Sequence, residues 1–472
     1  MVQSFNDIPF SIGTASAAMQ IEGSMPASNW SRWADQGRVV DGTSPHPTTD
    51  HWNRWREDNT LMQELGLQIA RISVEWARIE PRRGEFDVAA LDRYAEEIAD
   101  LQARGIAPLV TLHHFGHPLW FEDLGAFTRE ENVSLFLRYV TKVIQHLGHV
   151  VDDWVTINEP NVFATQAYLF RESPPGKVSW PSLIRTLRNM AVAHIQAYQL
   201  IHQQLDGPDR NIKVAFAHHV RVFTPLNRKN PLHQFFSVFN EWSFNRVVEE
   251  AFLLGKFSPI LGRPRSAIMP GHYADAIGIN YYSRTAVKGL SDGTFPNADV
   301  NDLGWEIYPQ GLVDVSNRLS RTYQLPIWIT ENGTADDGTG QPESESFRCR
   351  FLIDHLGALS AACAHGTPIE RYYHWCFVDN WEWTEGMAQR FGIVGMDPKT
   401  LNRVVKPSGY LMRDIIRHGG ITPEIREKYT EPGGYRRGVK LSQPGSHHRK
   451  TLGNGENTTG PSAHYTRGHS DD

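Results

Sequence analysis

Two acidic residues of this 472-residue chain each follow a short apolar run and precede a strand-ending signal. Residues 328–333 read WITENG, in which Glu331 comes just before an Asn-Gly turn signal. Residues 154–160 read WVTINEP, in which Glu159 comes just before a proline that cannot extend the strand. If the fold brings the two strand ends together, the carboxylates form the acid pair that cleavage of a glycosidic bond requires.

The elements that must position these carboxylates alternate regularly along the chain. Strand-like segments, several of them continuous and apolar, are separated by segments with helical periodicity. The predicted strands are Phe10–Thr14, Ile69–Ser73, Ile106–Leu112, Trp154–Asn158, Ile212–Ala217, Ala276–Asn280, Pro326–Glu331 and Arg371–Phe377. The predicted helices lie near Trp55–Leu65, Leu91–Leu101, Phe136–Leu147, Leu183–Leu205, the stretch up to Leu254, Gly311–Tyr323, Ser346–Cys363 and Ser408–Arg417.

This alternation favours an α/β fold with a parallel sheet, and eight units favour a single (β/α)8 TIM barrel over residues 1–429. All strands of such a barrel end at one face, where active sites lie. Glu159 and Glu331 follow the fourth and seventh predicted strands, so we expect both in one cleft. Their separation, ~5 Å in a retaining glycosidase and ~6.5–9.5 Å in an inverting one, cannot be measured from the sequence.

Composition narrows the class of protein further. The net charge of -6 is small for this length and indicates neither a nucleic-acid partner nor a membrane partner. No stretch approaches the ~20 apolar residues of a membrane span, and the N-terminus does not resemble a secretory signal, so we expect a cytoplasmic protein. The three cysteines match no zinc motif. Residues 430–472 are polar and interrupted by Gly and Pro, which predicts a flexible tail.

The sequences around Glu159 (TINEP) and Glu331 (ITENG) resemble the two signature motifs of glycoside hydrolase family 1, the β-glucosidase family. The resemblance covers about residues 5–425. It implies a retaining exo-β-glycosidase that releases terminal β-D-glucosyl residues from β-glucosides and short β-linked oligosaccharides, with side activity on β-galactosides or β-fucosides. Glu331 is then the nucleophile and Glu159 the acid/base. The implied partner is a small-molecule β-glycoside, with no cofactor and no metal, and a homo-oligomer is left open.

The resemblance also implies supporting residues for the two carboxylates. Arg71 resembles the family's arginine beside the nucleophile, and a neighbouring cation favours an ionised carboxylate. Tyr282 resembles the tyrosine that hydrogen-bonds the same group. Asn158 is expected to reach the sugar 2-hydroxyl. Glu159 must hold a proton at rest, so we expect its surroundings to raise its pKa.

Sugar binding is expected from a second set of residues that match the family. Gln20 and His114 resemble its hydroxyl-binding glutamine and histidine. Trp375 is expected to stack on the sugar ring, and Glu382 and Trp383 to bind the outer hydroxyls. Packing in the core is the alternative for Trp375, and a solvated charge is the alternative for Glu382.

A metal site is one alternative for His114, because His113 and His117 lie close to it in the sequence. A histidine packed in the core is the other. Two further functions also stay open. A transglycosylase would use the same residues as a hydrolase. A catalytically weak sugar-binding barrel would typically have lost one of the two carboxylates, and this chain has both.

The chain departs from the family pattern in two places. The family's His-Trp-Asp-Leu-Pro sequence is here residues 114–118, HFGHP, and Glu75 stands where a small or polar residue is common. We assign no catalytic role to Glu75. Residues 384–391 lack the Ser and Lys/Tyr set of the phospho-sugar branch, which favours an unphosphorylated sugar. Residues 169–180 and 297–305 are expected to shape the aglycone subsite.

Overall fold

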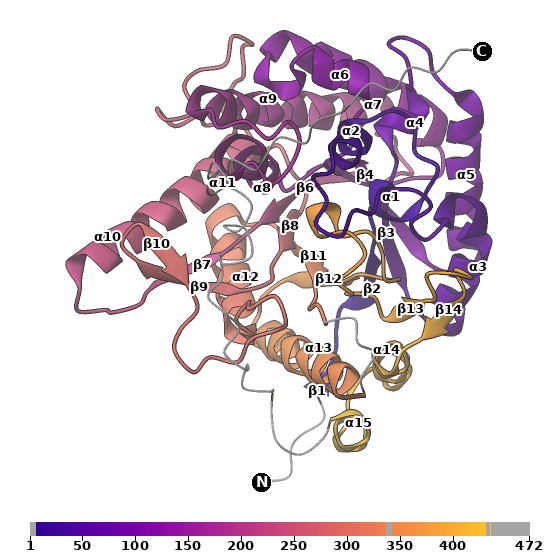
Figure 1. Cartoon of the computed structure of the whole chain (residues 1–472), viewed down its shortest axis with the longest axis vertical. Coiled ribbons are helices and arrows are strands. Elements are labelled where there is room, and N and C mark those ends of the chain that lie inside the picture. The colour runs from indigo at the N-terminus through magenta and orange to yellow at the C-terminus, as the bar shows by residue number, and fades with distance from the viewer. Residues whose placement is uncertain (1–5, 337–341, 431–434, 436–472) are drawn as a thin grey trace, which may run out of the picture.

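The computed structural model describes residues 6–336, 342–430 and 435. Eight parallel strands close into a barrel in the order β2-β3-β4-β5-β6-β8-β11-β12 (Figure 1). All eight predicted strands are present, which confirms the TIM barrel. Their bounds are β2 (Ser11–Ala15), β3 (Ile69–Ser73), β4 (Ala107–His113), β5 (Asp153–Asn158), β6 (Lys213–His219), β8 (Ile277–Asn280), β11 (Ile327–Asn332) and β12 (Ile369–Trp375).

Long helices surround the barrel (Figure 1). They are α3 (His51–Glu64), α5 (Val88–Ala103), α7 (Val133–Leu147), α9 (Trp180–Leu205), α11 (Val247–Leu254), α12 (Pro309–Tyr323), α13 (Pro342–Ala364) and α14 (Pro407–His418). Shorter helices lie in the connections and at the end of the fold: α1 (Ala18–Ile21), α2 (Asn29–Asp35), α4 (Trp76–Ile79), α6 (Leu119–Asp123), α8 (Pro160–Thr165) and α15 (Pro423–Tyr429).

The connection after β6 differs from the continuous helical stretch that the sequence predicts. β7 (Val222–Pro225) pairs with β9 (Arg284–Lys288), which pairs with β10 (Ser291–Gly293), to form a small second sheet. α10 (Pro231–Asn240) follows β7 and continues through a π-helical turn into α11. Figure 1 shows α10 and this sheet projecting from one side of the barrel. Two shorter pairings are antiparallel: β1 (Asn6–Asp7) with β15 (Gly420–Ile421), and β13 (Val394–Met396) with β14 (Arg403–Val405).

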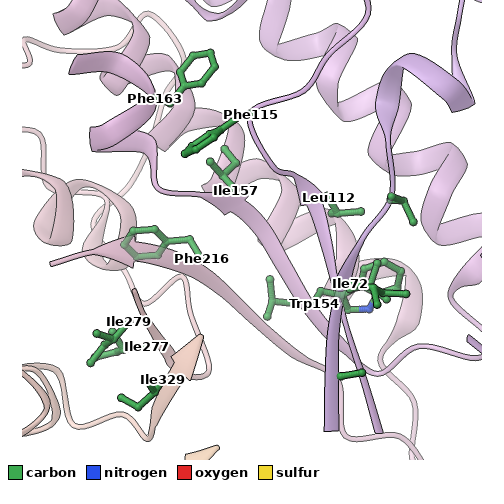
Figure 2. Close-up of a cluster of buried hydrophobic side chains, with 14 of the residues drawn as sticks. Ile72, Leu112, Phe115, Trp154, Ile157, Phe163, Phe216, Ile277, Ile279 and Ile329 are labelled. Carbon is green, nitrogen blue, oxygen red and sulfur yellow. The ribbon is translucent and has the colours of Figure 1, made fainter. Parts of the chain in front are cut away.

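Alternation along the strands divides the core into two layers. One set of side chains clusters inside the barrel: Ile69, Leu109, Val155, Ala215, Trp328 and Tyr373. Their neighbours pack with the helices, as Figure 2 shows for Ile72, Trp154, Phe216 and Ile329. Both faces of each strand are therefore buried, which is why these segments appear in the sequence as continuous apolar runs.

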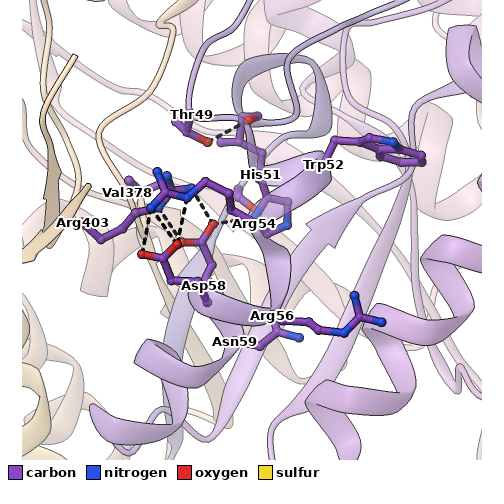
Figure 3. A network of polar contacts seen from close by, with 12 residues as sticks. Thr49, His51, Trp52, Arg54, Arg56, Asp58, Asn59, Val378 and Arg403 are labelled. Carbon is purple, nitrogen blue, oxygen red and sulfur yellow. Dashed lines mark hydrogen bonds and ion pairs between the residues drawn. The ribbon is translucent and has the colours of Figure 1, made fainter. Parts of the chain in front are cut away.

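A buried polar network joins α3 to the C-terminal part of the fold (Figure 3). His51 Nδ1 lies 2.7 Å from Asp58 Oδ2, and His51 Nε2 lies 2.9 Å from Glu97 Oε1. Arg403 Nε donates to Asp58 Oδ1 over 2.8 Å. Burial alone would lower the pKa of His51, but the charge of Glu97 and the hydrogen bonds with both carboxylates raise it to about 9.

No helix among the residues described here is long and apolar enough to cross a membrane. The predicted tail of residues 430–472 lies outside the described residues, apart from Thr430 and Tyr435. The Tyr435 hydroxyl donates to Asp354 Oδ2 of α13 over 2.7 Å.

Candidate active site

The end of β11 is irregular, and this irregularity places Glu331. Trp328 points into the barrel, so strict alternation would turn Glu331 toward the helices. Register shifts occur between Ile329 and Glu331 against β8, and between Ile329 and Asn332 against β12. Such irregularities re-aim side chains beside active sites. Position 333 needs glycine, because a Cβ there would lie 2.0 Å from the Trp375 carbonyl oxygen.

Glu331 has a cationic and a phenolic partner. Arg71 Nη1 lies 2.7 Å from Oε1, and the Tyr282 hydroxyl donates to Oε2 over 2.7 Å. Burial raises the pKa of Glu331 to about 7, and the charge of Glu159 adds to this rise, whereas Arg71 and Tyr282 oppose it. The structure therefore brings the predicted arginine and tyrosine into direct contact with the predicted nucleophile.

Arg71 lies two residues after Ile69 on β3 and therefore points into the barrel. Its guanidinium is buried and donates to four groups: Glu331 Oε1, the Thr330 carbonyl oxygen, Thr111 Oγ1 and Asn158 Oδ1, the last over 2.6 Å. These contacts hold one cation between the ends of β5 and β11. Asn158 immediately precedes Glu159, so both predicted motifs meet at this side chain.

Glu159 occupies the N-cap of α8 in a left-handed conformation, with φ 41° and ψ 59°. This conformation is unfavourable for a residue with a Cβ, and it aims the carboxylate into the barrel mouth. Oε1 of Glu159 lies 2.9 Å from His219 Nδ1 and accepts from Asn280 Nδ2 over 2.8 Å. Asn280 also donates to Asn158 Oδ1 over 3.1 Å.

The pKa of Glu159 does not follow the sequence-based expectation. Burial raises it, but the interaction with His219, the hydrogen bond from Asn280 and the positive charge of Arg71 together lower it below its ordinary value. The expectation that the surroundings raise this pKa is therefore wrong, because the sequence did not reveal His219. Two carboxylates that interact bind and release protons as a pair. For acid catalysis, the proton of this pair must be on Glu159 when the sugar is bound.

Three predicted sugar-binding residues form one buried cluster. Gln20 Nε2 donates to Asn380 Oδ1, to the Trp381 carbonyl and to Glu382 Oε2, over 3.0, 2.9 and 3.2 Å. Trp375 Nε1 donates to Glu382 Oε1 over 3.3 Å. Gln20 Oε1 is buried and has no partner among the described residues. Burial raises the pKa of Glu382 to about 8. A sugar hydroxyl can donate to the free amide oxygen, as the predicted role requires.

His114 and Trp383 lie on the other side of this cluster. Asn158 Nδ2 donates to His114 Nε2 over 3.0 Å, so His114 carries its proton on Nδ1, which has no partner among the described groups. The His114 ring lies between Trp375 and Trp383, with centroids 5.7 and 6.1 Å away. Trp383 also contacts Phe115 at 5.1 Å. His114 therefore offers a donor among aromatic faces.

The metal alternative for the histidines finds no arrangement to support it. Among the described residues, no group of three or more His, Cys, Asp or Glu side chains could hold a metal ion. His113 Nε2 lies 3.5 Å from His117 Nδ1, and His117 Nε2 lies 2.7 Å from Glu122 Oε2. These two rings pack behind the site among Phe121, Phe127 and Phe163.

The two departures from the family pattern occupy one place in space. A Cβ at Gly116 would lie 2.4 Å from Glu75 Oε2, so the missing side chain at 116 makes room for the carboxyl group of Glu75. Glu75 Oε1 accepts from the Ala77 N–H over 3.1 Å and caps α4, and Glu75 makes no ion pair with Arg71 among the described residues. Burial raises its pKa to about 8.

Two site residues were missed by the sequence analysis. His219 and Asn280 end β6 and β8, and both contact Glu159. The available signal was their position, because polar residues at the carboxyl ends of barrel strands belong to the catalytic face.

A closed barrel that buries two carboxylates at the ends of its strands fits a sugar-cleaving enzyme, because glycosidic bond cleavage uses such a pair. Residues 3–421 match the family described as Glycosyl hydrolase family 1, and the chain belongs to this family. Membership makes it a retaining β-glycosidase, which confirms the predicted class of enzyme.

Relatives match over most of their length. Beta-glucosidase A of Thermotoga maritima is 29% identical over 437 residues, covering 87% of this chain and 97% of the relative. A beta-galactosidase of Saccharolobus solfataricus is 28% identical over an alignment that covers 90% of this chain and 97% of the relative. The solved structure of a beta-glycosidase from Pyrococcus horikoshii superposes with a TM-score of 0.81 at 32% identity. The superposition covers 91% of this chain and 99% of that structure.

Proposed function

We propose that the chain is an exo-β-glucosidase in which Glu331 is the nucleophile and Glu159 the acid/base. The observation that carries this assignment is the difference between the partners of the two carboxylates. Glu331 is held by Arg71 and Tyr282, which favour a charged, fixed carboxylate. Glu159 has hydrogen bonds to Oε1 only, among the described residues, and so has one oxygen available for a proton.

In the first step, Glu331 attacks the anomeric carbon while Glu159 donates its proton to the glycosidic oxygen. The bond from the anomeric carbon to the leaving oxygen breaks as the bond to Glu331 forms. Esterification removes the negative charge of Glu331, so Glu159 is no longer opposed by its neighbour and stays ionised.

In the second step, Glu159 accepts a proton from water as the water oxygen bonds to the anomeric carbon. The ester bond to Glu331 breaks, and the released sugar has the β configuration of the substrate. Arg71 and Tyr282 again bind the freed carboxylate.

The sugar contacts follow from the free polar atoms around this pair. Gln20 Oε1, Glu382 and Trp383 take outer hydroxyls, His114 Nδ1–H donates to another, and Trp375 supplies an apolar face. Residues 384–391 lack the Ser and Lys/Tyr set of the phospho-sugar branch, which favours an unphosphorylated sugar. The relative named beta-galactosidase supports a side activity on β-galactosides.

A panel of p-nitrophenyl glycosides tests the assignment, followed by proton NMR of the first-formed sugar. We expect β-D-glucoside to be hydrolysed fastest, β-D-galactoside and β-D-fucoside more slowly, and the β-anomer to appear before mutarotation. Preferred turnover of a galactoside would overturn the β-glucosidase assignment, and first formation of the α-anomer would overturn the retaining mechanism.

We also propose that copies of the chain associate as a homo-oligomer through α10. Its exposed face carries Leu232, Phe235, Val238 and Phe239, with Phe235 61% and Val238 70% exposed. Contiguous apolar patches of this kind mark interaction surfaces. Light scattering should give a mass above the 53.5 kDa of one chain. Phe235→Ser should lower it to the monomer value, whereas Val404→Ser, at an exposed apolar residue of β14, should not.

A cytoplasmic location completes the proposal. Cys349, Cys363 and Cys376 are all unpaired, and free thiols persist in a reducing compartment. Cell fractionation tests this location, and recovery of the protein in the culture medium would contradict it.

A further inference from the structure

His219 connects the acid/base residue to the rest of the site. Its Nδ1 lies 2.9 Å from Glu159 Oε1. Its ring stacks on Tyr282, with centroids 5.9 Å apart and planes 21° apart, and Tyr282 in turn donates to Glu331. The edge of Phe244 closes the remaining side at 6.1 Å. One side chain from the end of β6 is therefore fixed against the partners of both carboxylates.

Arg221 determines which nitrogen of His219 carries the proton. Arg221 Nε donates to His219 Nε2 over 3.4 Å. A guanidinium has only donors, so Nε2 must act as an acceptor and cannot carry a hydrogen. This hydrogen-bond pattern assigns His219 as the neutral tautomer protonated at Nδ1. Nδ1–H then donates to Glu159 Oε1.

The same pattern separates the two oxygens of Glu159. Oε1 accepts from His219 Nδ1–H and from Asn280 Nδ2–H. No described group donates to Oε2, so Oε2 is the oxygen that can hold a proton without losing a hydrogen bond. The carboxyl group is thereby fixed through one oxygen and left free to transfer a proton through the other.

We propose that Arg221 and His219 are positioning residues for acid/base catalysis, in which Arg221 holds His219 neutral and His219 holds Glu159 by Oε1 so that Oε2 exchanges the proton. In the first step the Oε2–H bond breaks and its proton passes to the leaving oxygen. In the second step Oε2 receives a proton from water. Nδ1–H stays on Oε1 throughout and stabilises the carboxylate between the steps.

Loss of the hydrogen bond from Arg221 would change which member of the His219–Glu159 pair holds the proton. Among the described residues, Glu159 and Tyr282 contact His219, with Arg221 behind it. His218 also interacts with His219 electrostatically, Asp292 and Glu172 act on Arg221, and Arg71 and Glu331 lie one contact further away. Without the donor at Nε2, His219 can take a second proton and form an ion pair with Glu159. The proton would then reside on His219, and Glu159 would no longer serve as the acid at neutral pH.

The test compares kcat/KM for cellobiose and for 2,4-dinitrophenyl β-glucoside, whose leaving group needs no proton. His219→Leu should lower the value for cellobiose on the order of 10- to 100-fold and the value for the activated substrate less than about threefold. His219→Asn, which keeps a donor near Oε1, should recover most of the loss. Arg221→Met should move the alkaline limb of the pH profile for cellobiose down by about one pH unit, and Arg221→Lys by less.

A matched control is His146→Leu, because His146 also pairs with a carboxylate, Asp92, at 2.7 Å but on the outer helices. It should leave both values and the pH profile unchanged. Equal losses on the two substrates, or an unshifted profile in Arg221→Met, would overturn the inference.

The inference rests on the proposed role of Glu159. If Glu159→Ala itself affected both substrates equally, that role would fail first. If only the His219 and Arg221 variants did so, the inference alone would fail. If His219→Leu does not fold, the Asn and Arg221 variants carry the test.

Discussion

Arg71 Nη1 lies 2.7 Å from Glu331 Oε1, although the two residues are 260 positions apart in the sequence. The same guanidinium reaches Asn158, the residue before Glu159, over 2.6 Å. A single buried cation therefore holds together the ends of β5 and β11, which bear the two carboxylates. The two sequence motifs are linked in the folded chain through the side chain of Arg71.

Arg71→Met should impair both activity and stability. Arg71 opposes the burial that raises the pKa of Glu331, so its loss should raise this pKa further and move the acidic limb of kcat/KM to higher pH. We expect kcat to fall on the order of 10²- to 10³-fold, and the free energy of unfolding by roughly 3–5 kcal/mol, because a buried pair is broken. pH profiles and urea unfolding measure these effects. Arg56→Met, which removes an exposed pair with Glu96, should change neither. An unshifted acidic limb would contradict the contact.

Glu159→Ala should separate substrates by their leaving groups. The values of kcat/KM for cellobiose should fall on the order of 10²- to 10⁴-fold, because its alcohol must be protonated as it leaves. The value for 2,4-dinitrophenyl β-glucoside should fall far less. Steady-state kinetics on the two substrates gives the comparison, and similar losses on both would argue against an acid role for Glu159.

The barrel and its two acids could be predicted because their signals are local. Strands that are buried on both faces are continuous apolar runs, and Glu159 and Glu331 each precede a strand-ending signal. His219 was missed because the predicted fifth strand ended at Ala217, where the apolar run ends. β6 continues to His219 because His218 and His219 still pair with β8, and the His219 ring contacts Glu159.

Other features depend on contacts that no local pattern contains. β7 is only four residues long and half-buried, so its pairing with β9 leaves little periodicity to detect. Glu75 and Gly116 each departed from the family pattern, but only the fold shows that one side chain fills the space left by the other. The pKa of Glu159 likewise depends on His219, which lies 60 positions away in the sequence.

His51→Gln should remove a stabilising contribution that depends on pH. The pKa of His51 is raised from 6.5 to about 9 in the folded chain, so its contribution is fully present below about pH 6.5 and is lost as the pH rises through about 9. The shift corresponds to a free energy on the order of 3 kcal/mol. Thermal melting should show the largest difference between wild type and variant near pH 6, and a small one near pH 10.

The control for this prediction is His146→Gln, whose pairing with Asp92 lies at a partly exposed site. Its melting difference from wild type should be small at every pH. A His51→Gln difference that is constant from neutral to alkaline pH would show that the network of Figure 3 does not depend on a charged His51.

Gly116→Ala should destabilise the fold through Glu75. The added Cβ would lie 2.4 Å from Glu75 Oε2, and overpacking of this kind costs roughly 1–3 kcal/mol. The double variant with Glu75→Ala should lose less stability than the sum of the two single variants, because the shortened side chain relieves the clash. Urea unfolding measures the coupling. Gly207→Ala, at an open position, should be close to neutral, and strict additivity would contradict the shared space.

The most direct test of the account is the configuration of the glycosyl azide formed when azide restores turnover of dinitrophenyl β-glucoside to two variants. With Glu331→Ala, azide should attack the anomeric carbon from the side of the missing nucleophile and give the α-azide. With Glu159→Ala, azide should attack the glycosyl-enzyme from the opposite side and give the β-azide. Proton NMR distinguishes the two products. The β-azide from Glu331→Ala, or the α-azide from Glu159→Ala, would contradict the assignment of the two carboxylates.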